Sequence, residues 1–317
     1  MTHVETNQRR SPGFAAVFFL VLLRLAIGWH FFYEGAWKIQ SGAGGDEPSF
    51  SSAGYLKNAT GPLGPYFRKL AGDLDPDGRD ALDHAKLSKA WKTELDRVTE
   101  KFGFDAEQGK RAAEALTQTE SKADAWFEDS DNKRKIAEYF HKLDNYRVDS
   151  AAAKGFTRKS DWMKSAWSEI QSTKGELLGY VDGLSRSLRD QWNAIATPEQ
   201  IEKAGSYAPD KGMTPLIDKL TMYGLAAIGI GLIFGFLTRL SAFSAAVFLT
   251  LVYLSSPPWP GLPQSPMSEG HYLYVNKNLI ELIACLAIMS LPTGRWFGVD
   301  AILGAKSRPA AVEEDSR

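Results

Sequence analysis

Residues 24–39 read RLAIGWHFFYEGAWKI and follow the uncharged run GFAAVFFLVLL at 13–23. Arg24 therefore lies near the middle of an apolar stretch of about 20 residues, which is long enough to span the hydrocarbon core of a bilayer. A charged side chain at that depth is costly, and it marks either a functional position or a partner inside the protein. The stretch predicts a membrane helix that carries an internal polar site.

The composition of the whole chain hides this membrane character. The 317 residues have a net charge of −1 and a mean hydropathy of −0.25, values typical of a soluble protein of one or two domains. The apolar residues are concentrated at the two ends of the chain, whereas residues 40–210 are rich in charged side chains. The absence of a concentrated basic surface argues against nucleic acid as a partner, and the single cysteine excludes an internal disulfide.

Four apolar segments predict an all-α fold: a four-transmembrane-helix bundle with an inserted extracytoplasmic helical domain. The first transmembrane helix is expected at residues 13–40, and helices two to four within 213–293. The last of these apolar segments covers about 275–292. Residues 41–212 are the predicted insertion.

Lysine and arginine in the short flanks predict the orientation, because such residues favour the cytoplasmic side. All of them fall on one side of the four predicted spans: Arg9, Arg10, Arg239, Arg295, Lys306 and Arg308. The tails 1–12 and 294–317 are therefore expected in the cytoplasm, and the insertion on the opposite side of the membrane. A long domain crosses the membrane largely regardless of its own charge, so the lysines of the insertion do not conflict with this orientation.

The insertion has the apolar spacing of amphipathic helices. Helices are expected at 81–103, 131–146 and 175–195, where apolar residues recur at intervals of three and four. A short helix is expected at 197–205, with Thr197 as N-cap, proline in the first turn and glycine at the end.

The acidic stretch DLDPDGRDALDH at 73–84 has the first half of a calcium-loop spacing. His84 stands at the twelfth position, where a bidentate glutamate is required, and Pro76 lies inside the loop. We therefore interpret this stretch as a turn with helix-capping carboxylates. No histidine pair or Cys/His set has metal spacing, so no metal site is expected.

Polar residues within the predicted spans form the candidate site. On a helical wheel Gly28, Gly35 and Lys38 lie close to the face of Arg24, with Glu34 beside them. The predicted network consists of Arg24, His30, Glu34, Lys38, Asn278 and Glu281. We expect Arg24 to point into the bundle and to pair with Glu281 directly or through water, and Glu34 to pair with Lys38 one turn away. Two interpretations stay open: an ion-pair network that holds the bundle together, and a polar lining for a small substrate or a quinone headgroup.

Several of these motifs resemble the DoxX/DoxD-like family of four-helix bacterial membrane proteins. The first helix fits an Arg-x3-Gly-x5-Glu/His-Gly-x2-Lys pattern. The family's glycine-rich segment ending in Thr-Arg is matched at 229–243, GIGLIFGFLTRLSAF. The glycine followed by an aspartate is matched at 278–303, NLIELIACLAIMSLPTGRWFGVDAIL. FSSAGYLKNATGPLGPYFRKLAG at 50–72 is similar to a segment of DoxD-type members. The positions that carry over by motif are Arg24, Gly28, Glu34, Gly35, Lys38, Arg239 and Asp300.

The resemblance implies a multi-pass protein of the bacterial inner membrane. Some members are the small subunit of a thiosulfate:quinone oxidoreductase, and others belong to thiol or oxidative-stress complexes. The chain has no recognisable flavin, haem or metal site, so a redox role implies a membrane subunit next to a quinone, with no covalently bound cofactor.

Two functions from different classes follow. The first is the membrane subunit of a quinone-linked oxidoreductase, which works with other membrane or periplasmic redox proteins. The second is a non-catalytic scaffold, whose inserted helical domain binds an envelope partner and whose buried charges only stabilise the bundle.

Overall fold

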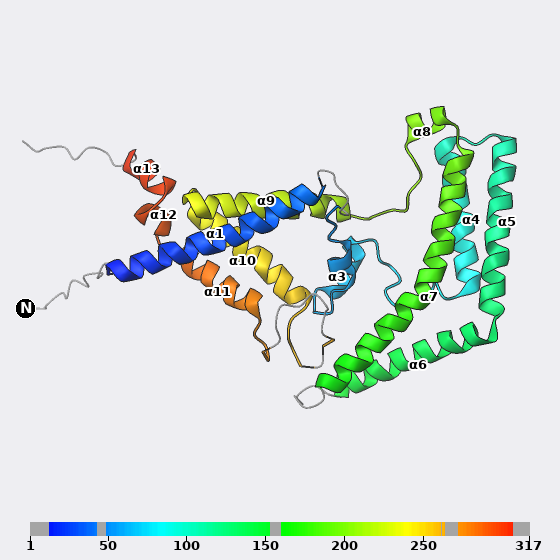
Figure 1. The fold of residues 1–317 in the computed structure, drawn as a ribbon, viewed down its shortest axis with the longest axis horizontal. Coiled ribbons are helices and arrows are strands. Elements are labelled where there is room, and N and C mark those ends of the chain that lie inside the picture. Colours follow the sequence, from blue (N-terminus) through cyan, green and yellow to red (C-terminus); the bar gives the residue numbers. More distant parts are fainter. Residues whose placement is uncertain (1–12, 43–48, 153–159, 261, 264–271, 307–317) are drawn as a thin grey trace, which may run out of the picture. The chain divides into compact units, whose positions relative to one another are not determined.

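The computed structural model describes residues 13–42, 49–152, 160–260, 262–263 and 272–306 (Figure 1). Every regular element in these ranges is a helix, and the only extended pairing among them is an isolated bridge between Tyr272 and Val275. The all-α class predicted from the sequence is confirmed. The chain divides into two compact units, and residues Arg68–Gly212 form most of the second.

The first unit contains three helices that are long and apolar enough to cross a membrane. These are α1 (Phe14–Gly42), α9 (Thr214–Phe234) and α10 (Thr238–Ser255). Their composition identifies the chain as a membrane protein.

The fourth predicted span is shorter than expected. In place of an apolar helix over 275–292, α11 (Lys277–Ser290) has 14 residues, or about 21 Å at 1.5 Å per residue. A hydrocarbon core is about 30 Å thick, so α11 does not meet the length of a span. Two short helices follow it, α12 (Thr293–Trp296) and α13 (Val299–Lys306). Three candidate spans are present in the described chain, and the four-span bundle stays a prediction.

Glycines bring α1 and α9 into close antiparallel contact. A Cβ added at Gly28 would lie 2.9 Å from the backbone nitrogen of Ile233, and one added at Gly35 would lie 2.9 Å from the Cα of Ala226. On α9, a Cβ at Gly229 would lie 2.6 Å from the Cα of Phe32. Small residues allow the backbones of membrane helices to approach in this way.

Asp300 fixes the turn between α9 and α10. Gly235 ends α9 with φ of 63°, a left-handed conformation that glycine adopts without strain. The carboxylate of Asp300 accepts hydrogen bonds from the backbone N–H groups of Leu237 and Thr238, both at 2.9 Å. The backbone N–H of Asp300 donates to the carbonyl of Gly235 at 2.9 Å. Asp300 thus bonds to polar backbone groups both at the end of α9 and at the start of α10.

The short helix α2 (Ala53–Lys57) packs at the opposite end of this bundle, and α3 (Gly64–Leu70) follows it in the chain. The backbone N–H and the hydroxyl of Ser52 donate to Asp218 Oδ1 on α9, at 2.6 and 2.5 Å. Tyr55 on α2 donates to the carbonyl of Val252 at 3.0 Å and bonds to the hydroxyl of Ser255, both on α10. This segment therefore packs with the membrane helices, although it lies within the predicted insertion 41–212.

The second unit is a helical domain with its own core. Its helices are α4 (His84–Phe102), α5 (Ala106–Glu128), α6 (Ser130–Ala152), α7 (Ser160–Ile195) and α8 (Pro198–Ala204). Trp91 and Trp192 are fully buried, and their indole N–H groups donate to Ser185 Oγ at 2.9 Å and to the Ala112 carbonyl at 3.1 Å. Both partners satisfy an indole donor that burial would otherwise leave unpaired.

The predicted helices of this domain are present, with changes in extent. The short helix has the expected Thr197 cap, which is part of a capping box with Gln200. Helix α7 begins well before the predicted 175–195, and α5 was not predicted. The interior of α5 is rich in alanine and in polar side chains, so its apolar spacing is weak in the sequence.

The close contact between α1 and α9 gives a first testable prediction. Replacing Gly229 with alanine should lower the free energy of unfolding by about 1–3 kcal/mol, because the new methyl group collides with the backbone of Phe32. Gly224 lies on the same helix and would meet nothing within 4 Å. Gly224→Ala should therefore be neutral or stabilising. Thermal unfolding in detergent measures both, and equal effects would contradict the proposed role of Gly229.

Candidate functional site

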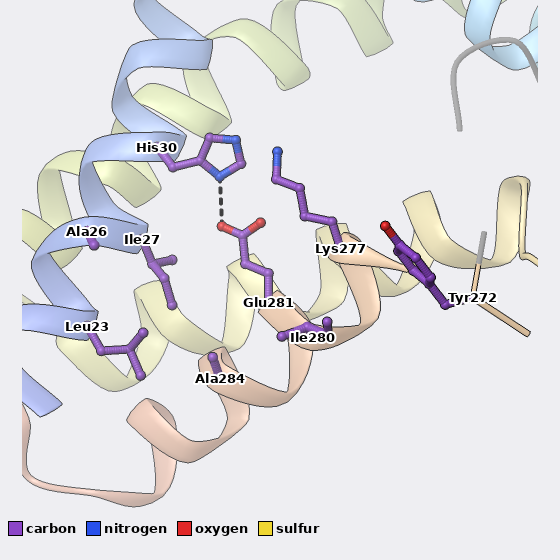
Figure 2. Close-up of a pocket in the computed structure, with 9 residues that line it drawn as sticks. All are labelled: Leu23, Ala26, Ile27, His30, Tyr272, Lys277, Ile280, Glu281 and Ala284. Atoms are coloured by element: carbon purple, nitrogen blue, oxygen red, sulfur yellow. Dashed lines mark hydrogen bonds and ion pairs between the residues drawn. The ribbon is translucent and has the colours of Figure 1, made fainter. Parts of the chain in front are cut away.

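A groove of about 620 Å³ opens between α1 and α11 (Figure 2). Its walls are mainly apolar, with Leu23 and Ile27 on α1 and Ile280 and Ala284 on α11. Ligand pockets of this size are typically apolar with a few polar groups that fix the orientation of the ligand. We call this cavity the α1–α11 groove.

The polar groups of the groove begin with a histidine–glutamate pair. His30 Nδ1 on α1 and Glu281 Oε1 on α11 are 2.7 Å apart, and Figure 2 shows both side chains meeting across the groove. His30 is 38% exposed and Glu281 is 9% exposed. Asn276 begins α11 by accepting a hydrogen bond from the N–H of Leu279 at 3.0 Å, which places Glu281 near the start of the helix. The pair therefore joins two helices far apart in sequence.

The second oxygen of Glu281 is the unusual feature of the site. Glu281 Oε2 is buried, and no described residue donates a hydrogen bond to it. Leaving a buried acceptor unpaired costs about 1–3 kcal/mol, and more for a charged group. Such groups are rare in folded proteins and indicate a site where a ligand or water completes the bonding.

Lys277 and Tyr272 also line the groove, and the predicted network omitted both. The ammonium group of Lys277 lies on the same side of the groove as the His30–Glu281 pair in Figure 2, and it interacts electrostatically with His30. Lys277 lies one helical turn before Glu281, and this spacing is visible in the sequence. Tyr272 lies in an irregular segment, where no periodic signal could identify it.

A second, smaller pocket of about 160 Å³ lies on the other side of His30. Glu34, Lys38 and Asn278 line it together with His30. Lys38 donates a hydrogen bond to Glu34 one turn away, as predicted. The structure thus gathers five of the six predicted network residues around His30, which borders both cavities.

Arg24 is the exception, and its predicted pairing with Glu281 is wrong. Arg24 is 0% exposed, and its Nη1 donates to the carbonyl of Thr293 at 2.9 Å. Its Nε and Nη2 are buried without a hydrogen-bond partner among the described residues. Arg24 lies about 9 Å along the axis of α1 from His30, and it faces α12 rather than the start of α11. Its electrostatic partner is Asp300.

The other positions that carry over by motif lie outside the groove. Gly28 and Gly35 form the contact with α9. Arg239 and Asp300 lie at the turn between α9 and α10. None of these four residues lines the α1–α11 groove: the two glycines serve the packing of α1 on α9, Asp300 bonds to the helix ends, and Arg239 is exposed beside the turn.

The acidic loop of the second unit has its carboxylates engaged within the protein. Asp75 Oδ2 accepts hydrogen bonds from the N–H groups of Asp80 and Ala81 at 2.8 and 2.9 Å. Arg147 Nη2 donates to both oxygens of Asp77, at 2.7 and 2.8 Å. This is the turn and capping arrangement that the sequence predicted. No group of acidic, histidine or cysteine side chains suited to a metal ion occurs among the described residues.

Tyr139 completes this loop by donating to the carbonyl of Asp77 at 2.8 Å. Burial raises the pKa of Tyr139 to about 12, so the phenol stays protonated and continues to donate at physiological pH.

Comparison with protein-family models, with curated proteins and with solved structures finds no match to this chain.

The His30–Glu281 pair can be tested by a double-mutant cycle. His30→Gln and Glu281→Gln should couple by about 0.5–3 kcal/mol in unfolding free energy, because each substitution removes the same interaction. Arg24→Leu combined with Glu281→Gln is the control, and these changes should be additive within about 0.5 kcal/mol. Chemical denaturation in detergent measures both cycles. A larger coupling energy in the Arg24 cycle than in the His30 cycle would indicate that Glu281 interacts with Arg24, against the arrangement in the structure.

The acidic loop is expected not to bind calcium, and this can be tested by thermal unfolding. Calcium at about 5 mM, above the range in which extracellular calcium modules bind, should leave the melting temperature unchanged. Asp77→Asn should lower the melting temperature without calcium, because it weakens the bonds from Arg147. A calcium-dependent rise in the melting temperature that is lost in Asp77→Asn would contradict this interpretation.

Proposed function

We propose that this chain is the membrane subunit of a quinone-linked oxidoreductase of the thiosulfate or thiol oxidation type. In this proposal the α1–α11 groove receives the quinone headgroup. The single observation that carries the proposal is the buried Glu281 carboxylate, which bonds to His30 with one oxygen and receives no hydrogen bond at the other from any described residue. The resemblance to the DoxX/DoxD-like family supports the choice of reaction class.

The groove has the chemistry that a quinone requires. Its volume of about 620 Å³ and its leucine and isoleucine walls suit a lipophilic ring and its tail. A quinone accepts hydrogen bonds at its carbonyl oxygens, and Lys277 is a donor at the polar end of the groove. A quinol donates from its hydroxyl groups, and Glu281 Oε2 is an acceptor at the same end. The same few side chains therefore fit both redox forms.

A bound quinone would supply two-electron redox chemistry coupled to two protons. The residues of this chain hold and move the protons. The proton shared by His30 Nδ1 and Glu281 Oε1 lies at the boundary of the groove and the smaller pocket of Glu34 and Lys38. Histidine and carboxylate side chains exchange protons readily, and the smaller pocket continues this polar path away from the groove.

Electrons enter from a partner in this proposal. The sequence contains no dinucleotide fingerprint and a single cysteine, so it offers no flavin motif or thiol pair of its own. We propose a membrane or periplasmic redox protein as donor. The location is the bacterial inner membrane, with both chain termini in the cytoplasm and the helical domain outside, on the basis of the arginines that flank the apolar segments.

Binding of a short-chain ubiquinol analogue, the reduced form whose hydroxyl groups donate hydrogen bonds, to the purified protein tests this proposal. The wild type should bind, as measured by quenching of tryptophan fluorescence, and Glu281→Gln should weaken binding about tenfold or more, because a charged hydrogen-bond acceptor is lost. Glu34→Gln is the matched control, since Glu34 lines the smaller pocket and not the groove. It should keep wild-type affinity.

Two outcomes would contradict the proposal. Wild-type protein that does not bind the analogue would favour the non-catalytic scaffold, in which the charges only stabilise the bundle. Equal loss of affinity in Glu281→Gln and Glu34→Gln would show that the quinone does not occupy the α1–α11 groove. Circular dichroism of each variant confirms that the helices remain folded.

A further inference from the structure

A pocket of about 470 Å³ lies beside the turn between α9 and α10, separate from the α1–α11 groove. We call it the turn pocket. Leu240, Leu291 and Leu303 give it apolar walls, and Arg239 and Arg295 line it from α10 and α12. The pocket thus combines two cations with a surface that suits hydrocarbon.

The two arginines have no anionic partner in the described chain. Both side chains are exposed, and neither forms an ion pair or a side-chain hydrogen bond with any described residue. Asp300 is the only carboxylate among the described residues that line the pocket, and its two oxygens accept hydrogen bonds from the backbone N–H groups of Leu237 and Thr238. Asp300 also faces the buried charge of Arg24. Among the described residues, no anion therefore neutralises the two arginines.

Thr238 provides an independent sign of a missing partner. It lines the turn pocket and is 2% exposed, and its hydroxyl is buried without a hydrogen-bond partner among the described residues. A hydroxyl is both a donor and an acceptor, so it can donate a hydrogen bond to an oxyanion in the pocket. Buried polar groups are rarely left unpaired in folded proteins.

The position of the pocket along the helices indicates where the anion comes from. Arg239 is in the first turn of α10, directly after the end of α9, and both helices are candidate membrane spans. The turn pocket therefore lies at the end of two apolar helices, at the level where lipid phosphates meet the hydrocarbon core. Basic pockets at this level between membrane helices bind lipid headgroups.

We infer that the turn pocket binds the phosphodiester of an anionic phospholipid. Arg239 and Arg295 contact the phosphate, Thr238 donates to it, and the leucine walls contact the first part of the acyl chains. A free phosphate ion would contact the two arginines but would gain nothing from the leucine side chains. This inference does not depend on the proposed redox function.

Native mass spectrometry of the full chain in mild detergent tests the inference. Phosphatidylglycerol should bind in preference to phosphatidylcholine at equal concentration, and inorganic phosphate should not compete for the site. Replacing Arg239 or Arg295 with glutamine should weaken phosphatidylglycerol binding about 5-fold for each residue, and the double variant about 25-fold. Lys219→Gln is the control, because it removes an exposed cation near the opposite end of α9.

Other results would overturn the inference. Equal binding of the two lipids, or an equal loss in Lys219→Gln, would mean that the protein has no specific site at the turn. Competition by inorganic phosphate would identify a free phosphate site in place of a lipid site. The melting temperature of the wild type provides a measurement that needs no variant: phosphatidylglycerol should raise it, and an equal rise with phosphatidylcholine would contradict the inference.

Discussion

The close backbone contact between α1 and α9 is the constraint on which the rest of the membrane unit depends. Gly28, Gly35 and Gly229 leave no room for a side chain, so α1 can take only one rotation about its own axis against α9. That rotation places His30 at the groove with α11 and turns Arg24 towards α12. Because the glycine face of α1 is fixed against α9, the helix presents His30 to the groove and Arg24 to the interior of the bundle.

The sequence predicts those parts of the structure that depend on neighbouring residues. The three long apolar helices, the Thr197 cap and the Glu34–Lys38 bond each follow from spacing within a single segment. The partner of Glu281 does not, because it depends on the register between α1 and α11, which lie far apart in the chain. Five of the six predicted network residues meet around His30, whereas the choice of Arg24 as the partner of Glu281 was wrong.

The polar groups of the membrane unit separate into two sets with different physical roles. Around Arg24, Asp300 and Thr293, hydrogen bonds mostly satisfy backbone groups at helix ends, and they hold α1, the α9–α10 turn and α12 in place. Around His30, the side chains bond to one another and border open volume. Residues of the first set can be replaced only at the expense of the fold, whereas those of the second set are free to interact with a ligand.

The short α11 has a consequence for the lipid around the protein. If α11 crosses the bilayer as the fourth span, its 14 residues fall about 9 Å short of the thickness of a hydrocarbon core, which is a large hydrophobic mismatch. A span this short would require the bilayer to thin at this place, or water to enter beside the helix. Because Glu281 lies near the start of α11 and bonds to His30, such a span would bring the aqueous phase close to the only histidine–carboxylate pair that the described membrane helices contain.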